Sequence, residues 1–147
     1  MSAEAEVRRA SMQFYAGLNR MLNGNAESLK DIWSHGADVT AMHPVGGRQV
    51  GWDAVRASFE KVSGLASHGK VELKDPLIRV IGDMAYEAGV ERGQVTLATE
   101  PVTIEHRVTN IYRREAGEWK MIHHHTDTSP EMMNAVGRLP QRTRKAG

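Results

Sequence analysis

The sequence predicts an α+β fold in which helices cover one face of an antiparallel sheet. Apolar residues recur at steps of three and four over most of the first 63 residues, and at every second position from residue 71 onward. The first spacing is that of an amphipathic helix, and the second is that of a strand with one buried face. Because the strands follow the helices as a run, helices segregated to one side of a sheet are favoured over alternating β–α–β units.

Three helical segments are expected in the first half of the chain. Apolar residues line one face over residues 7–21, and Gly24 ends this helix because glycine accepts the left-handed conformation beyond a last turn. Asn25 can cap a short second helix, and residues 52–63 form a third helix with one apolar face. A short strand over residues 39–43 separates the second helix from the third.

The second half of the chain predicts strands only. Each segment alternates apolar and polar residues, and turn residues such as Pro76, Gly93 and Gly117 separate the segments. The expected strands are residues 71–73, 77–81, 84–92, 94–98, 102–113 and 118–127. We therefore expect one domain over residues 1–130, followed by a helical turn and a basic tail over residues 131–147.

Composition and charge exclude several classes of protein. The chain has 19 Lys and Arg against 18 Asp and Glu, a net charge of +1 that argues against a nucleic-acid partner. It has no cysteine, so disulfides, a thiol nucleophile and thiolate metal sites are excluded. No apolar run approaches the ~18 residues of a membrane span, and the first residues do not form a secretory signal. We expect a cytoplasmic protein without a membrane partner, whose basic residues 138–145 form a solvated tail.

Alternation along the strand at residues 84–92 predicts which side chains face the helices. Tyr86 shares a face with apolar neighbours, and Arg92 continues that face. The opposite face carries Glu87 and Glu91, a pattern typical of solvent exposure. We therefore expect Tyr86 and Arg92 to point inward, where a guanidinium could grip a carboxylate of a ligand. An ion pair of Arg92 with Glu105 or Asp127 is the alternative.

The strand at residues 102–113 places two more polar residues on an apolar face. His106 and Asn110 alternate in step with valine, isoleucine and tyrosine side chains. Buried polar groups must find partners or cost about 1–3 kcal/mol each, so their presence predicts a polar-lined cavity. On the last strand both faces carry apolar residues, and the alternation does not decide which of His123, His124 and His125 points inward.

Three segments carry a resemblance to a known family. Residues 38–47 read DVTAMHPVGG, residues 51–56 read GWDAVR, and residues 112–125 read YRREAGEWKMIHHH. Together they resemble the nuclear transport factor 2-like superfamily, in particular its SnoaL-like and ketosteroid isomerase-like branch, and the association domain of calcium/calmodulin-dependent kinase II. The resemblance implies a cone-shaped, curved antiparallel sheet that encloses a pocket together with three helices from the N-terminal half. It also implies a homodimer that packs through the outer face of the sheet.

The same resemblance implies roles for individual residues. His43 occupies the place of the aspartate base of ketosteroid isomerases. The helix-1 tyrosine and the protonated aspartate of those enzymes would fall near Gly17 and Val108, neither of which can donate from a side chain. In the kinase association domain the pocket holds arginines, of which Arg92 would be one, with Asn110 and Thr126 in place of others. Packing through the outer face would put Ile122, His124 and Thr126 in the pocket, and Trp119, Met121, His123 and His125 on the interface.

These observations lead to three functional hypotheses. The first is a cofactor-free enzyme that transfers protons on a small organic molecule, as an isomerase, lyase or cyclase does, and Arg92 would favour an anionic one. The second is a non-catalytic module for ligand binding or oligomerisation, and the third is a histidine metal site, for which His123 and His125 or the three pocket histidines are the candidates. The catalytic candidates are His43, His106 and His124. The ligand-binding candidates are Arg92, Asn110, Tyr86, Trp33 and Thr126.

Overall fold

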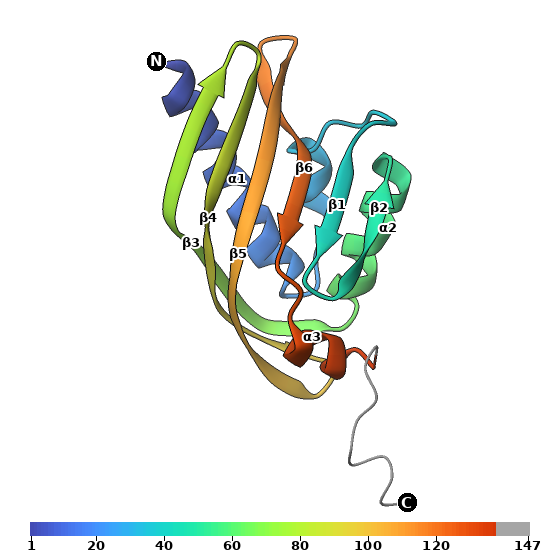
Figure 1. The fold of residues 1–147 in the computed structure, drawn as a ribbon. Helices are drawn as coiled ribbons and strands as arrows, with labels where there is room; N and C mark the ends of the chain where they lie inside the picture. The colour runs from blue at the N-terminus through green and yellow to red at the C-terminus, as the bar shows by residue number, and fades with distance from the viewer. Residues whose placement is uncertain (138–147) are drawn as a thin grey trace, which may run out of the picture.

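The computed structural model describes residues 1–137, so the basic segment at residues 138–145 lies outside the described residues. A six-stranded, curved and unclosed sheet forms one layer, and helices cover its concave face (Figure 1). The strand order is β2-β1-β6-β5-β4-β3. The strands are β1 (Thr40–His43), β2 (Gly46–Val50), β3 (Ala66–Ile81), β4 (Met84–Leu97), β5 (Glu100–Glu115) and β6 (Glu118–Thr126). The predicted α+β class with helices on one side is confirmed.

The helices form where the sequence predicts them. α1 (Ala3–Met21) begins after Ser2, whose Oγ accepts from the Ala5 amide, and it packs on β3 and β6. The second helix, η1 (Glu27–Asp31), is a single 3₁₀ segment, and α2 (Trp52–Ser63) packs on β1 and β2. A short α3 (Pro130–Ala135) follows the sheet. None of the helices within residues 1–137 has the length and apolar character needed to cross a membrane.

The sheet departs from the expected antiparallel pairing at one place. β1 pairs with β6 in parallel, with Thr40 opposite His123 and Met42 opposite His125. Parallel neighbours need a long crossover, which here consists of α2 and four strands of the same sheet. This pairing brings His43, at the end of β1, to the part of the sheet that carries the histidines of β6.

Two of the expected strand breaks are wrong. The ladder between β3 and β4 continues through Pro76, because a register shift between Lys74 and Leu77 absorbs the extra residues as a bulge. Gly93 likewise stays within β4, opposite Val71. A Cβ at Gly93 would lie 1.8 Å from the carbonyl oxygen of Lys70, so the glycine permits a close approach of two strands rather than a turn.

A bulge in β6 decides which of its side chains face the helices. Ile111 of β5 lies opposite His123 while Tyr112 lies opposite Met121, so Ile122 is an additional residue in the ladder. Strict alternation would place Met121 and His124 on opposite faces, but the bulge turns both of them inward, where both are buried. The expectation that Trp119 and Met121 lie on the outer face is therefore wrong, whereas His124 and Thr126 face inward as expected.

Candidate functional site

A small cavity lies between the concave face of the sheet and the C-terminal part of α1. Its volume is about 50 Å³, and its walls are mostly apolar side chains from α1, α2 and the sheet. Four polar residues also line it: His43, Glu91, His106 and His124. All four are buried, with exposed fractions of 2–7%. A polar cluster under an apolar cavity is the usual setting of a functional site, and its geometry follows from the strands that hold it.

Glu91 of β4 is at the centre of the cluster. Its Oε1 accepts from His106 Nε2 at 2.8 Å, and its Oε2 accepts from the Tyr15 hydroxyl at 2.9 Å. Burial raises the pKa of Glu91, but the hydrogen bonds that it accepts from His106 and Tyr15 act in the opposite direction, and the pKa lies below its ordinary value. Glu91 is therefore an ionised carboxylate in the interior, at hydrogen-bonding distance from two donors.

The orientation of Asn110 fixes the tautomer of His124. Asn110 Nδ2 donates to Glu87 Oε1 at 3.1 Å and to the Tyr15 hydroxyl oxygen at 3.1 Å. A carboxylate only accepts, so the amide nitrogen faces Glu87 and the amide oxygen faces His124. That oxygen lies 2.6 Å from His124 Nδ1, which must carry the proton of the bond. Nε2 of His124 is left as an acceptor, 4.0 Å from Glu91 Oε2.

His124 is neutral near pH 7. Burial lowers its pKa to about 4, and the opposing charge of Glu91 only partly offsets this effect. A buried imidazole with a bare Nε2 next to an ionised carboxylate can accept a proton, because the resulting imidazolium would have a counter-ion in place. The side chains of the site therefore include the parts of a general base.

His43 forms the opposite wall of the cavity. Its Nε2 lies 2.7 Å from Ser58 Oγ, whose hydroxyl donates to the Val55 carbonyl at 2.6 Å. Because that hydroxyl proton is used, the Ser58 oxygen accepts and Nε2 of His43 carries the hydrogen. The ring contacts Phe59 edge-on and lies 6.2 Å from the ring of His124. The structure thus brings the three predicted histidines to one cavity.

A second layer of buried polar groups supports the cluster from behind. The Tyr112 hydroxyl donates to Glu87 Oε1 at 2.8 Å. Burial, followed by the nearby carboxylates, raises the pKa of both Tyr15 and Tyr112 well above the ordinary value, so both stay protonated as donors. Such fully partnered networks hold their members in one arrangement.

Arg92 and Tyr86 do not belong to this site, so their expected inward placement is wrong. Both lie on the convex face of the sheet, where Arg92 Nε contacts Glu105 Oε1 at 3.0 Å and Tyr86 is 38% exposed. The ladder between β4 and β5 runs without a shift, so the buried Ala85, Val95 and Leu97 fix the odd-numbered positions as the inner face. The alternative ion pair of Arg92 with Glu105 is the one observed.

The remaining predicted residues are buried near the cluster in different ways. Asn110 lies behind His124 and is the hub of its hydrogen bonds. Trp33 packs in the core against Trp52 and Phe59, with ring centroids 6.4 and 5.8 Å away. Thr126 faces inward, and its Oγ1 is buried without a hydrogen-bond partner among residues 1–137.

Three residues of the site were missed by sequence reasoning: Tyr15, Glu87 and Glu91. The expected strand ends before Gly93, and over residues 84–92 alone the alternation predicts that the two glutamates face solvent. Followed through Gly93, the same face continues into Val95 and Leu97, and this apolar continuation is the signal that would have found them. The first helix carries a buried tyrosine, Tyr15, two positions before Gly17, and its hydroxyl donates to Glu91.

The metal alternative finds no support in the arrangement of the histidines. Within residues 1–137 no group of three or more histidine, aspartate or glutamate side chains is placed to hold a metal ion. His123 and His125 project from the convex side of β6 with ring centroids 5.7 Å apart, and His123 Nδ1 lies 2.6 Å from Thr40 Oγ1.

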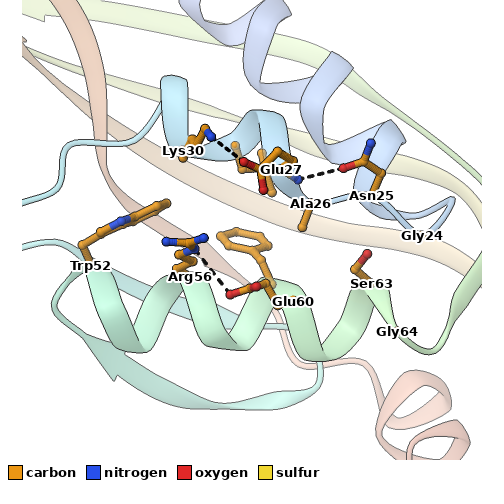
Figure 2. A pocket seen from close by; sticks show the side chains of 12 residues that line it. Gly24, Asn25, Ala26, Glu27, Lys30, Trp52, Arg56, Glu60, Ser63 and Gly64 are labelled. Atoms are coloured by element: carbon orange, nitrogen blue, oxygen red, sulfur yellow. Dashed lines mark hydrogen bonds and ion pairs between the residues drawn. The ribbon is translucent and has the colours of Figure 1, made fainter.

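A larger hollow of about 280 Å³ lies on the surface between η1 and α2 (Figure 2). Each charged side chain that lines it pairs with a neighbour: Lys30 with Glu27, and Arg56 with Glu60 at 3.4 Å. These pairs are solvent-exposed, as is common on a protein surface. The buried cavity, with its ionised carboxylate and neutral imidazole, is the better candidate for chemistry.

Comparison with known structures agrees with the fold. A protein from Streptomyces avermitilis, provisionally named a dehydratase of the NTF2-like family, is 24% identical over 86% of this chain and 95% of its own, with a TM-score of 0.76. A protein from Thiobacillus denitrificans, provisionally named a calcium/calmodulin-dependent protein kinase type II association domain, is 25% identical over 83% and 94%, with a TM-score of 0.68. A protein from Shewanella frigidimarina, provisionally named a ketosteroid isomerase, is 18% identical over 81% and 92%, with a TM-score of 0.66.

The sequence itself gives the family. No curated protein matches the chain. The model of the SnoaL-like domain matches residues 8–128, which include every residue of the cluster described above. The chain therefore belongs to the SnoaL-like domain family, with the NTF2-like fold.

Proposed function

We propose that the protein is a cofactor-free enzyme that moves a proton on a small organic molecule, with His124 as the base. The observation that carries this proposal is the bare Nε2 of a buried, neutral His124 at 4.0 Å from the ionised Glu91. General bases of this kind contribute on the order of 10²–10⁴ to a rate. The names of two similar structures, a dehydratase and a ketosteroid isomerase, agree with this chemical class.

In the proposed reaction, Nε2 of His124 takes a proton from a carbon next to a carbonyl group of the ligand. The electron pair of the C–H bond passes to the carbonyl, and the imidazolium is stabilised by the Glu91 carboxylate. Return of the proton to another carbon gives an isomer. Return of the proton to a departing hydroxyl gives water and an alkene conjugated with the carbonyl. Neither route needs a co-reactant.

The other two histidines have different proposed roles. His106 donates to Glu91 at 2.8 Å and so keeps the carboxylate in place next to His124. His43 lies on the far wall of the same cavity and is the proposed second proton carrier. Substitution of His43 by alanine should reduce turnover by a factor on the order of 10²–10⁴ while the fold is retained.

Proton transfer can be tested before the natural substrate is identified. The protein is incubated in D₂O with 2-butanone, 3-hydroxy-2-butanone or 4-hydroxy-2-butanone, and NMR follows loss of the α-proton signal while ultraviolet absorbance follows enone formation. We expect exchange or water loss above the buffer rate, reduced by a factor on the order of 10²–10⁴ in His124→Gln. Arg92→Ala, on the convex face, is the matched control and should retain the wild-type rate. A rate that is equal in the wild type and His124→Gln would contradict the proposal.

A non-catalytic association module is the second candidate. It is supported by the 25% identity to the protein named as a kinase association domain, and by apolar side chains exposed on the convex face of β3 and β4. These side chains are Leu77, Ile81, Met84 and Tyr86, with exposed fractions of 45%, 70%, 44% and 38%. We propose that this face forms the homodimer contact. Light scattering after size exclusion should give a dimer that Tyr86→Glu dissociates, and a wild-type monomer would contradict it.

A further inference from the structure

We infer that the ligand of the His124 cavity is a small, uncharged molecule that presents a hydroxyl group, and that the cavity rejects anions. This inference rests on the proposed function, since it names the class of molecule on which the proposed proton transfer would act. It replaces the expectation of an anionic ligand, which depended on Arg92 pointing inward.

The charge of the cavity is the first argument. No lysine or arginine is among the described residues that line it, and Glu91 brings a negative charge to its wall. His124 does not supply a positive charge to balance it, because burial lowers the pKa of His124 and keeps the ring neutral near pH 7. Glu87, a second carboxylate, is buried behind Asn110 and is 1% exposed. A ligand carboxylate would therefore be buried against like charge with no cation to pair it.

The supply of hydrogen-bond donors and acceptors is the second argument. The donors at the cavity are already engaged: His106 Nε2 and the Tyr15 hydroxyl donate to Glu91, and Nε2 of His43 donates to Ser58. The tautomer of His124 leaves Nε2 as an acceptor on the same wall. A ligand that donates a hydrogen bond therefore finds a partner, whereas one that only accepts would compete for a donor in use.

The apolar walls and the volume narrow the class further. Apart from the four polar residues, the lining is almost entirely aliphatic and aromatic, and a cationic ligand would lose its hydration there. Both oxygens of Glu91 already accept a hydrogen bond, so the carboxylate has less to offer a cation than a free one would have. A volume of about 50 Å³ has room for a few water-sized groups at about 10–15 Å³ each. Four-carbon alcohols are therefore suitable probes.

The inference is tested by binding rather than turnover. ¹⁵N-labelled protein is titrated at pH 7 with 2-butanol, 2-butanone, isobutyrate and sec-butylamine, which are similar in size and differ in charge and donor. We expect shift changes at the cavity residues with 2-butanol, and at least about tenfold weaker binding of isobutyrate. Glu91→Gln should reduce the difference in affinity between 2-butanol and isobutyrate. Arg92→Ala, the control at the next position on the convex face, should leave that difference unchanged.

Two outcomes would overturn the inference. One is isobutyrate or sec-butylamine binding as tightly as 2-butanol, and the other is 2-butanone binding as tightly as the alcohol. If Glu91→Gln does not fold, the wild-type protein still decides, because an alcohol that donates to His124 must shift the ¹⁵N resonance of Nε2. A protein that does not catalyse the proposed reaction can still bind 2-butanol more tightly than isobutyrate. A protein that does catalyse it can show the opposite order of affinities. Failure of the inference is therefore distinguishable from failure of the proposed function.

Discussion

Two neighbouring positions of the β4–β5 ladder carry the same kind of cross-strand pair on opposite faces of the sheet. Glu91 pairs with His106 on the concave face at 2.8 Å, and Arg92 pairs with Glu105 on the convex face at 3.0 Å. The side chains of the first pair are 4–5% exposed, and those of the second are 58–59% exposed. One step along the chain therefore separates an interior pair from a solvated one.

The difference shows why only one of the two pairs indicates function. The charges of an exposed pair interact with water almost as favourably as with each other. Such a pair therefore contributes ~0–1 kcal/mol to the free energy of unfolding. A buried pair loses its hydration, so its remaining hydrogen-bonding groups must be satisfied by other side chains. For Glu91 these come from α1 and β5, since Tyr15 donates to Glu91 and is itself contacted by Asn110. An interior network of this kind, at the wall of a cavity, is a candidate for chemistry.

The largest contrast is expected from removing each carboxylate. Glu91→Ala leaves His106 and the Tyr15 hydroxyl buried without an acceptor, and should lower the free energy of unfolding by ~3–5 kcal/mol. Glu105→Ala, the matched change on the convex face, should cost less than ~1 kcal/mol. Urea denaturation of both variants measures the difference. Equal losses would show that burial does not separate the two pairs.

The inner face should also make stability depend on pH. The pKa of His124 is about 4 in the folded protein, below its ordinary 6.5. Between these values the unfolded chain binds a proton that the folded chain does not, so the free energy of unfolding should fall by on the order of 3 kcal/mol as the pH drops from 6.5 to 4. The lowered pKa of Glu91 acts in the same direction below its ordinary 4.5, because the unfolded chain again binds the proton first.

Urea denaturation at several pH values measures this dependence, with His124→Gln as the control. The variant should lose most of the slope between pH 6.5 and 4. The burial effect on His124 would be refuted by a wild-type curve that is flat over this range, or by a variant with the wild-type slope.

A smaller effect is expected from the residue that connects the two layers. Asn110→Ala removes the acceptor of His124 Nδ1 and a donor to Glu87, and each buried group left unpaired costs about 1–3 kcal/mol. The same variant should release the tautomer of His124, which ¹H–¹⁵N correlation of the imidazole would detect. Asn110→Asp keeps an oxygen toward His124 and should retain the Nδ1-protonated tautomer.

The smallest effect is expected at Arg92. Arg92→Ala should change the free energy of unfolding by less than ~1 kcal/mol, and should leave binding in the cavity unchanged because the side chain lies on the convex face. Denaturation and the alcohol titration check both parts. Loss of binding in this variant would mean that Arg92 reaches the ligand after all.

The sequence was sufficient for the fold class, because the change of apolar period from helix to strand does not depend on contacts made at a distance. The sequence was also sufficient to predict that the side chains of His106 and Asn110 face inward, since β5 alternates along its whole buried length. It did not predict that Glu91 is buried, because Gly93 allows a close approach of two strands and, in the sequence alone, resembles a glycine of a turn. It failed for Trp119 and Met121 because one bulge residue, Ile122, exchanges the faces, and a bulge is defined by the partner strand rather than by the strand that contains it.

The most direct test of the site is the protonation of His124, observed by long-range ¹H–¹⁵N NMR of the imidazole from pH 8 to pH 4 and assigned with His124→Gln. A neutral ring with its proton on Nδ1 should persist down to about pH 5, with titration near pH 4. A ring that titrates near 6.5, or that carries its proton on Nε2, would contradict the assignment of His124 as the buried base.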